Sequence, residues 1–230
     1  MNQAITMHGW AGDASNWRHW REELMALGWH WSDGERGYGN LPPRSPSWHP
    51  EPGRRLLIAH SLGLHLLPSS VLETATDVVL LGSFGRFVPS DRAGRAIRAG
   101  LAGMASALGS SEERGMLERF LTRAAQPLPL SALPPSSLLE GVTAAGRHRL
   151  AADLTVLQEC SALPAAFPAN ARVLVVQGNL DAIVPAISQQ QLTAALPGDR
   201  IEIVTLPDWG HALINLPVLA RVRAWLEQGP

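Results

Sequence analysis

The 230-residue sequence predicts an α/β fold in which a mainly parallel, six-stranded sheet is covered by helices on both faces. Short, fully apolar segments alternate with helical patterns, which is typical of parallel strands that are buried on both sides. A chain of this length can also bury a sizeable core as one domain. The alternation stops between residues 84 and 171, so we expect that segment to lie outside the sheet.

The elements of the predicted core follow one another in the order strand, helix, strand. Strands are expected at Ala4–Met7, Trp29–Ser32, Leu56–Ala59, Val78–Leu81, Arg172–Gln177 and Arg200–Leu206. Helices are expected at Ala14–Leu27, Leu62–Thr74, Ile187–Ala195 and Pro217–Glu227. The core is therefore predicted to comprise residues 1–83 and 172–230.

Residues 84–171 carry helical patterns only. Apolar residues recur at helical spacing within residues 97–108, 116–121 and 150–157. Ser-x-x-Glu patterns at 110–113 and 137–140 are typical of helix starts, because the Ser and Glu side chains can cap free backbone N–H groups. The segment is therefore predicted to be an all-helical lid over a site at the sheet edge.

Residues 59–63, with the sequence Ala-His-Ser-Leu-Gly, mark a candidate nucleophile. They join the apolar strand Leu56–Ala59 to an apolar helical segment, the context of a nucleophile elbow with the pattern Gly-x-Ser-x-Gly. Small flanking residues are needed because the turn is tight, and Ala59 is the next smallest residue to glycine. Ser61 is the predicted nucleophile.

A candidate acid and base follow Ser61 in the chain order Ser, acid, His. Asp181 lies in a turn just beyond the buried strand Arg172–Gln177, and His211 follows Gly210 after the last strand. Asp208 is the less favoured acid, because it lies very near His211 and fits a turn residue. The sequence therefore predicts a catalytic triad of Ser61, Asp181 and His211.

The first strand leads into His8-Gly9-Trp10, the position expected for an oxyanion loop. The backbone N–H groups of Trp10 and Leu62 are the predicted oxyanion donors. His8 is expected to support this turn, and His60 to point away from the nucleophile by strand alternation. Asp153 lies on a helical pattern, where a solvated position is expected.

Composition excludes several classes of protein. A hydrophobic content of 46% with 17% charged residues argues against disorder, and no apolar run approaches the roughly 18 residues of a membrane span. No secretory signal is apparent, and the single cysteine, Cys160, suits a reducing cytoplasm. Neither clustered metal ligands nor a phosphate-binding glycine loop is present. We expect a cytoplasmic protein with no cofactor, no metal and no nucleic-acid or membrane partner.

The chain resembles the α/β-hydrolase superfamily over nearly its whole length. Within it, the chain is similar to the pimeloyl-acyl-carrier-protein methyl ester esterases of biotin synthesis. The motifs concerned are His-Gly-Trp-Ala at 8–11, Arg-Gly-Tyr-Gly at 36–39, Glu-Arg-Phe-Leu at 118–121, Gly-Asn-Leu-Asp at 178–181 and Gly-His-Ala at 210–212, besides the elbow at Ser61. The resemblance implies a serine carboxylesterase that forms an acyl-enzyme.

The same resemblance implies that the lid holds an acidic carrier protein through arginines. Arg119 matches one such position, and Arg114 approximates another. Arg123 would share a helix face with Arg119, and Phe120 lies between them. A second basic stretch expected from the family is replaced here by a proline-rich segment. A small acyl ester, carried or free, is the expected ligand.

Two alternatives remain open on the sequence. The protein could be another serine hydrolase that acts on esters, thioesters or lactones. It could also be a non-catalytic ligand-binding protein on a hydrolase scaffold, because fold does not fix function. Turnover of a simple ester separates the second alternative from the enzymes.

Overall fold

Six strands form a single parallel sheet in the computed structural model, which describes residues 1–229. The strands are β1 (Gln3–Met7), β2 (His30–Gly34), β3 (Arg55–His60), β4 (Asp77–Leu81), β5 (Arg172–Gly178) and β6 (Ile201–Leu206). They lie in the order β2-β1-β3-β4-β5-β6, and every neighbouring pair is parallel. The predicted fold class is confirmed.

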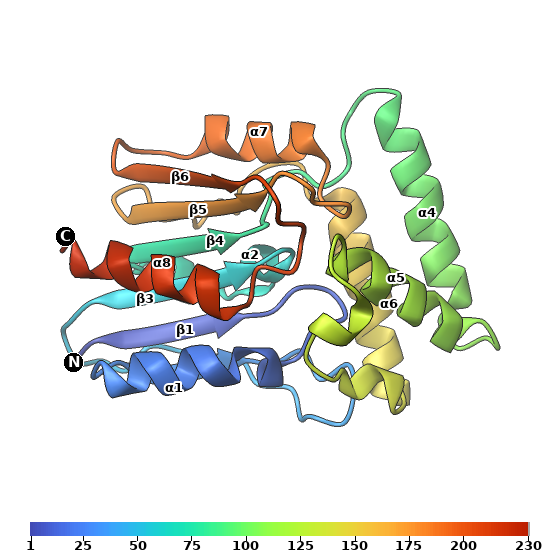
Figure 1. Cartoon of the computed structure of the whole chain (residues 1–230), viewed down its shortest axis with the longest axis horizontal. Helices are drawn as coiled ribbons and strands as arrows, with labels where there is room; N and C mark the ends of the chain where they lie inside the picture. The colour runs from blue at the N-terminus through green and yellow to red at the C-terminus, as the bar shows by residue number, and fades with distance from the viewer. Residues whose placement is uncertain (230) are drawn as a thin grey trace.

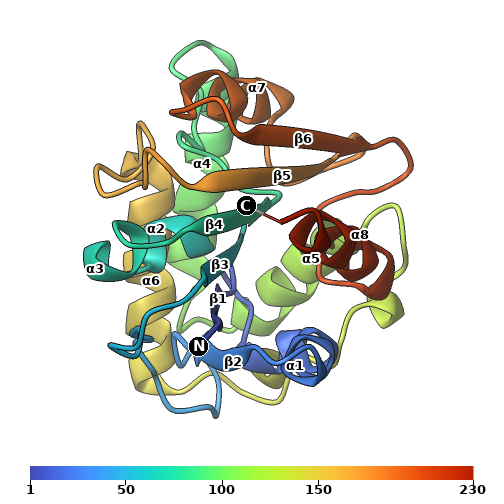
Figure 2. The same ribbon diagram turned by 90° about the vertical axis from the view of Figure 1, so that its left-hand side faces the viewer.

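Helices cover both faces of the sheet (Figures 1 and 2). One face is covered by α1 (Arg18–Ala26), which follows the short 3-10 helix η1 (Ala14–Trp17), and by α8 (Leu216–Glu227). The other face is covered by α2 (Gly63–Leu66), α3 (Ser69–Leu72) and α7 (Ala186–Ala195).

The apolar strands fill both cores because successive side chains point to opposite faces. In β3, Leu56 and Ile58 pack with α1 and α8, whereas Leu57 and Ala59 pack with α2, α3 and α7. All four side chains are fully buried. Because both faces of β3 are buried, the strand is apolar at all four of these positions, as expected for a parallel sheet covered on both sides.

The single helix predicted over Leu62–Thr74 is wrong: the structure contains two short helices, α2 and α3, in its place. Pro68 separates them. Proline lacks the N–H that a helix interior needs and forces the preceding residue into an extended conformation, and Leu67 has ψ 144°.

Three longer helices follow β4 and precede β5 in the chain, and they lie beyond the carboxyl ends of the strands (Figure 1). They are α4 (Ala93–Ala107), α5 (Glu113–Ala125) and α6 (Ala144–Glu159), with the 3-10 helices η2 (Leu130–Ala132) and η3 (Ser137–Leu139) between α5 and α6. Their apolar faces share a core with Trp10 and Leu62 at the sheet edge. None of the helices in residues 1–229 is long and apolar enough to cross a membrane.

The two Ser-x-x-Glu patterns do not act as capping boxes. The Glu113 carboxylate accepts from the Gly109 N–H rather than from Ser110, and α5 begins only at Glu113. Ser137 opens the 3-10 helix η3, and its hydroxyl donates to Asp13. The following helix, α6, is capped instead by Thr143, which accepts from the Gly146 N–H.

Candidate active site

Ser61 occupies a sharp turn directly after β3. Its φ of 56° lies in the left-handed region, which among the non-glycine residues of 1–229 is shared only with Ala11. Such a conformation costs about 1–3 kcal/mol and persists only where the surroundings impose it. The Ser61 N–H donates to the Leu81 carbonyl at the end of β4, which fixes the turn.

The glycines around Ser61 allow its backbone to approach the oxyanion loop. A Cβ on Gly63 would lie 2.4 Å from the Met7 carbonyl oxygen, and one on Gly9 would lie 2.7 Å from the Ser61 Cβ. Neither contact is sterically tolerable. The small residues that mark the motif in the sequence are therefore required by the close packing of two loops.

Asp181 and His211 meet at the carboxyl ends of β5 and β6. The Asp181 carboxylate lies 2.8 Å from His211 Nδ1 and accepts from the N–H groups of Ile183 and Val184. Burial raises the pKa of Asp181, but His211 and the two amides outweigh burial and lower this pKa below its ordinary value. Because a carboxylate can only accept, Nδ1 carries a hydrogen and Nε2 of the neutral ring is left as an acceptor.

His60 supports His211 rather than pointing away from the site. Its Nε2 lies 2.9 Å from the His211 carbonyl oxygen, and the two rings are 4.8 Å apart. Strand alternation does send His60 to the face opposite Ala59, but the loop that carries His211 crosses that face. Burial, followed by repulsion from His211, lowers the pKa of His60 to about 3, so His60 is neutral.

Two cavities adjoin Ser61 on different sides. The large cavity, of about 600 Å³, extends between α4, α5 and α6 and is mainly apolar. The small cavity, of about 90 Å³, is lined by His60, His211 and the proline-rich segment after α5. Ser61, Trp10 and Phe120 line both, whereas His211 lines the small cavity only. The Trp10 and Phe120 rings pack edge to face, 4.8 Å apart, at the boundary.

The predicted oxyanion donors lie beside Ser61. Trp10 lines both cavities with it, and Leu62 follows it in the chain. Within residues 1–229, neither the Trp10 nor the Leu62 backbone N–H donates to a protein acceptor. Both residues are buried. A buried N–H without a partner is rare, and an anion bound between the two loops would satisfy both groups.

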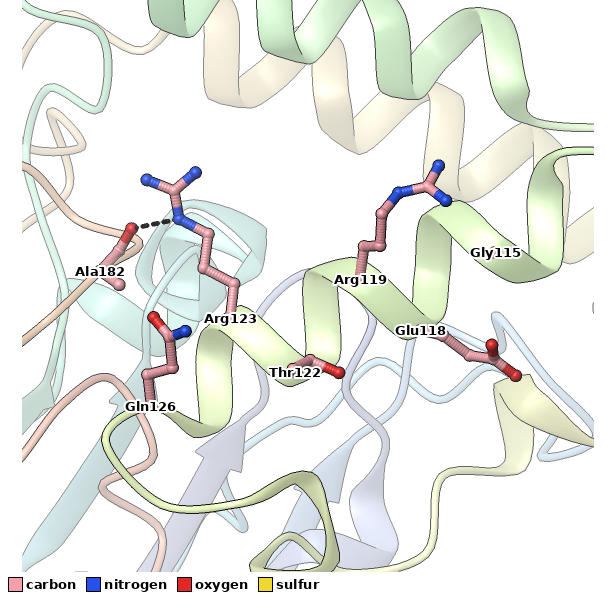
Figure 3. A pocket seen from close by; sticks show the side chains of 7 residues that line it. All are labelled: Gly115, Glu118, Arg119, Thr122, Arg123, Gln126 and Ala182. Carbon is pink, nitrogen blue, oxygen red and sulfur yellow. Dashed lines mark hydrogen bonds between the residues drawn. The ribbon is translucent and has the colours of Figure 1, made fainter.

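The four residues named from the sequence for carrier binding divide into two groups. Arg119 and Arg123 line both the large cavity and an adjoining open hollow of about 690 Å³, and Phe120 lines the large and small cavities. Figure 3 shows the two guanidinium groups on one side of α5, with Arg123 bonded to the Ala182 carbonyl. Arg114 lines neither cavity nor the hollow, and bonds Glu118 and the Leu139 carbonyl.

Asp153 is not on a solvated face. It is 1% exposed and accepts from both Nε and Nη2 of Arg36, at 2.8 and 2.6 Å, and from the Tyr38 hydroxyl. The polar partners come from the loop after β2, far away in sequence. No local pattern on α6 could reveal them, although Arg36 and Tyr38 belong to the Arg-Gly-Tyr-Gly motif. In residues 1–229 no group of His, Cys, Asp or Glu is arranged to hold a metal ion.

Comparison with known proteins supports the fold. No protein-family model matches the chain, and no curated protein matches its sequence. Solved structures similar to it include a thermophilic esterase from Thermogutta terrifontis (TM-score 0.65, 18% identity, 99% of this chain and 90% of the other). An esterase from Exiguobacterium antarcticum has TM-score 0.69 and 13% identity over 99% and 90% of the two chains.

A hydrolase from Oleispira antarctica is similar to the same extent, with TM-score 0.69 and 15% identity over 100% and 92% of the two chains. Together with the six-stranded parallel sheet, these likenesses show that the chain has the α/β-hydrolase fold. At these identities they concern the fold alone. What the chain does depends on its own site residues.

Proposed function

We propose that the protein is a serine ester hydrolase with Ser61 as nucleophile, His211 as base and Asp181 as the acid that orients it. One observation carries the proposal: the strained Ser61 turn and a histidine bonded to a buried carboxylate line the same cavity. Strain at Ser61 has no value for stability and is typical of a functional site. A ligand-binding protein would need neither the strain nor the His–Asp pair.

The proposed reaction has two halves. Ser61 Oγ attacks the ester carbonyl carbon while its proton passes to His211 Nε2, and the carbonyl oxygen becomes an oxyanion between the Trp10 and Leu62 N–H groups. Each such donor contributes on the order of 3 kcal/mol to the transition state. His211 then protonates the departing alcohol, leaving an acyl-enzyme. Water, deprotonated by His211, attacks the acyl carbon, and the carboxylic acid leaves as Ser61 regains its proton.

We assign the two parts of the ester to the two cavities. His211 must reach the oxygen of the leaving alcohol, and it lines only the small cavity. The alcohol therefore belongs in the small cavity, whose volume suits a methoxy or ethoxy group. The acyl chain belongs in the large apolar cavity. A methyl ester of a medium-length acyl group fits this division, as the resemblance to the pimeloyl methyl ester esterases implies.

An acyl carrier protein is the proposed source of the acyl chain. The large cavity opens beside Arg119 and Arg123, which also line the open hollow. Glu118, which could neutralise them, is bonded to Arg114 instead, and in Figure 3 its side chain points away from both guanidinium groups. An acidic carrier would find the Arg119 guanidinium there and the terminal nitrogens of Arg123, whose Nε is bonded to Ala182. We place the reaction in biotin synthesis and in the cytoplasm, where the single Cys160 stays reduced.

Methanol release tests the catalytic proposal. The purified protein is incubated with a pimeloyl-carrier methyl ester and, separately, with the dimethyl ester of the same acid without a carrier. Methanol and the released acid are measured by mass spectrometry. Turnover of both, abolished in Ser61→Ala, is expected. Turnover of the free ester alone would favour a serine hydrolase of small esters. Turnover of neither, with thioesters and lactones also inert, would favour a non-catalytic ligand-binding protein.

Charge reversal tests the carrier. Arg119→Glu/Arg123→Glu should raise KM for the carrier-linked ester and flatten its salt dependence, because the long-range attraction is lost. Both arginines also line the acyl cavity, so hydrolysis of the free ester should change a little, but much less than hydrolysis of the carrier-linked ester. The matched control, Arg18→Glu/Arg221→Glu, changes two exposed arginines elsewhere on the surface. Equal loss on both substrates would indicate misfolding of α5, and no loss on either would exclude these arginines from the partner surface.

A further inference from the structure

Asp153 on α6 is a buried carboxylate that the reaction above does not use. Its bidentate bond with Arg36 and its bond with Tyr38 connect α6 to the loop after β2. Burying such a charge is costly unless it is fully paired, and a buried ion pair is often no more stabilising than apolar residues of similar volume. A contribution to stability alone therefore does not explain why a carboxylate is buried at position 153.

The same loop is bonded to the oxyanion loop through His8. The Arg36 backbone N–H lies 3.2 Å from His8 Nε2, and the Gly9 carbonyl beside Nδ1 can only accept, so Nδ1 carries a hydrogen. His8 Nδ1 lies 2.8 Å from the Gly9 carbonyl oxygen, to which it donates. Glu35, whose carboxylate is 3.5 Å from His8, accepts from the Gly37 and Ala14 N–H groups and so fixes the loop from its other side.

The bond to the Gly9 carbonyl sets the direction of the next N–H. In a trans peptide the carbonyl and the N–H that share its plane point in opposite directions. The Gly9 carbonyl is held by His8 and by the Gly12 N–H at 3.2 Å. The N–H in the same peptide plane belongs to Trp10, and it must therefore point away from His8.

Helix α6 also holds the side chain of Trp10. The indole Nε1–H donates to the Leu150 carbonyl at 2.9 Å, one helical turn before Asp153. The following residue, Ala11, has a φ of 59°, so the backbone of this loop is itself strained and depends on its surroundings. Helix α6 therefore holds the Trp10 side chain directly, through Leu150, and its backbone indirectly, through the bonds of Asp153, Arg36 and His8.

We propose that Asp153 and Arg36 are positioning residues that aim the Trp10 N–H at the oxyanion. The inference rests on the proposed function, since it concerns the transition state of that reaction. We call the set Asp153, Arg36, His8 and Gly9 the positioning relay. Through this relay, the position of α6 beside the large cavity affects how well the Trp10 N–H stabilises the oxyanion.

The relay predicts a loss in kcat with little change in KM. Removing an oxyanion donor lowers kcat about 10²–10³-fold, so a donor that is misdirected rather than removed should lower it about 10- to 100-fold. Asp153→Asn is the test variant. Glu113→Gln is the matched control, because Glu113, at the start of α5, also makes a bidentate bond to an arginine of α6, Arg147, but has no bond to the oxyanion loop or to the loop after β2.

A tetrahedral analogue separates positioning from general weakening of the fold. An alkylboronic acid bound to Ser61 places an oxygen at the oxyanion position, whereas a substrate in its ground state does not depend on that donor. In Asp153→Asn the boronate inhibition constant should rise about tenfold or more while KM stays within about twofold. Equal effects in Asp153→Asn and Glu113→Gln, or a boronate constant that does not change, would overturn the relay.

Two further variants keep the test valid if Asp153→Asn fails to fold. The triple variant Asp153→Leu/Arg36→Met/Tyr38→Phe removes the buried carboxylate, its half-buried partner and the hydroxyl together, which can be nearly neutral for stability. Its kcat should still be reduced, and a normal kcat would overturn the relay. Tyr38→Phe alone should lower kcat severalfold at unchanged KM, and an unchanged kcat would contradict it. A wild type that neither turns over esters nor binds the boronate would instead refute the proposed function.

Discussion

The size limit of the leaving alcohol is set by the small cavity, which Leu121 lines on the side of the proline-rich segment. The cavity holds about three water molecules, at about 30 Å³ each. A methoxy or ethoxy group fits, whereas an n-butoxy group overfills the space. Overfilling a packed site costs about 1–3 kcal/mol, which corresponds to about a 5- to 150-fold loss of kcat/KM.

Leu121→Ala should relieve this limit. Leu121 is 8% exposed and lines both the small cavity and a neighbouring hollow of about 250 Å³ at the proline-rich segment, as do Leu133 and Pro134. Shortening Leu121 should extend the small cavity toward that hollow. The matched control is Leu157→Ala, the same change at a residue that is 6% exposed and lines only the large cavity. Each variant should lose about 2–5 kcal/mol of stability, so the assay is run well below both melting temperatures.

The assay compares kcat/KM for methyl, ethyl and n-butyl esters of one acyl chain, and then for methyl esters of several acyl chains. In the wild type, kcat/KM should fall steeply from ethyl to n-butyl. Leu121→Ala should reduce that fall to about threefold or less. Leu157→Ala should keep the fall and alter the acyl-chain preference. Relief of the n-butyl penalty by Leu157→Ala and not by Leu121→Ala would show that the two cavities are assigned the wrong way round.

Three further predictions concern the site. Asp181→Asn and His211→Ala should each lower turnover about 10⁴–10⁶-fold with an unchanged far-UV spectrum, and near-normal turnover in Asp181→Asn would exclude it as the acid. Gly9→Ala should abolish turnover, because its Cβ would lie 2.7 Å from that of Ser61; full activity would show that the close approach of the two loops is not what requires this glycine. Because the folded pKa of His60 is about 3, against 6.5 when unfolded, only the unfolded chain binds this proton between those values. The free energy of unfolding should therefore fall as the pH decreases from 6.5 towards 3, by up to about 1.4 kcal/mol per pH unit from His60 alone. Urea titrations from pH 6.5 to 5 should show a shallower slope for His60→Gln, and equal slopes would refute this reasoning.

The parallel sheet and the motifs at its edge could be predicted because both depend on local sequence. Strands such as β3 and β5 are short, apolar and bounded by turns, and parallel strands bring their carboxyl ends to one edge. Ser61, Asp181 and His211 each lie in a turn or loop beyond the carboxyl end of a strand. Their common position at that edge follows from topology alone.

The remaining features depend on contacts between distant segments. Asp153 has an ordinary place in a helical pattern, and only the packing of α6 on the loop after β2 makes it a buried ion-pair partner of Arg36. His60 supports His211 because two loops cross at the sheet edge. Pro68, by contrast, is a visible signal in the sequence, and the break between α2 and α3 could have been predicted from it.

The covalent labelling of Ser61 tests the central claim most directly. The protein is treated with an alkyl fluorophosphonate, and the modified peptide is identified by mass spectrometry in the wild type and in Ser61→Ala. We predict a single adduct on the peptide containing Ser61 in the wild type and none in the variant. An unlabelled wild type, or an adduct on another serine that persists in Ser61→Ala, would contradict the account.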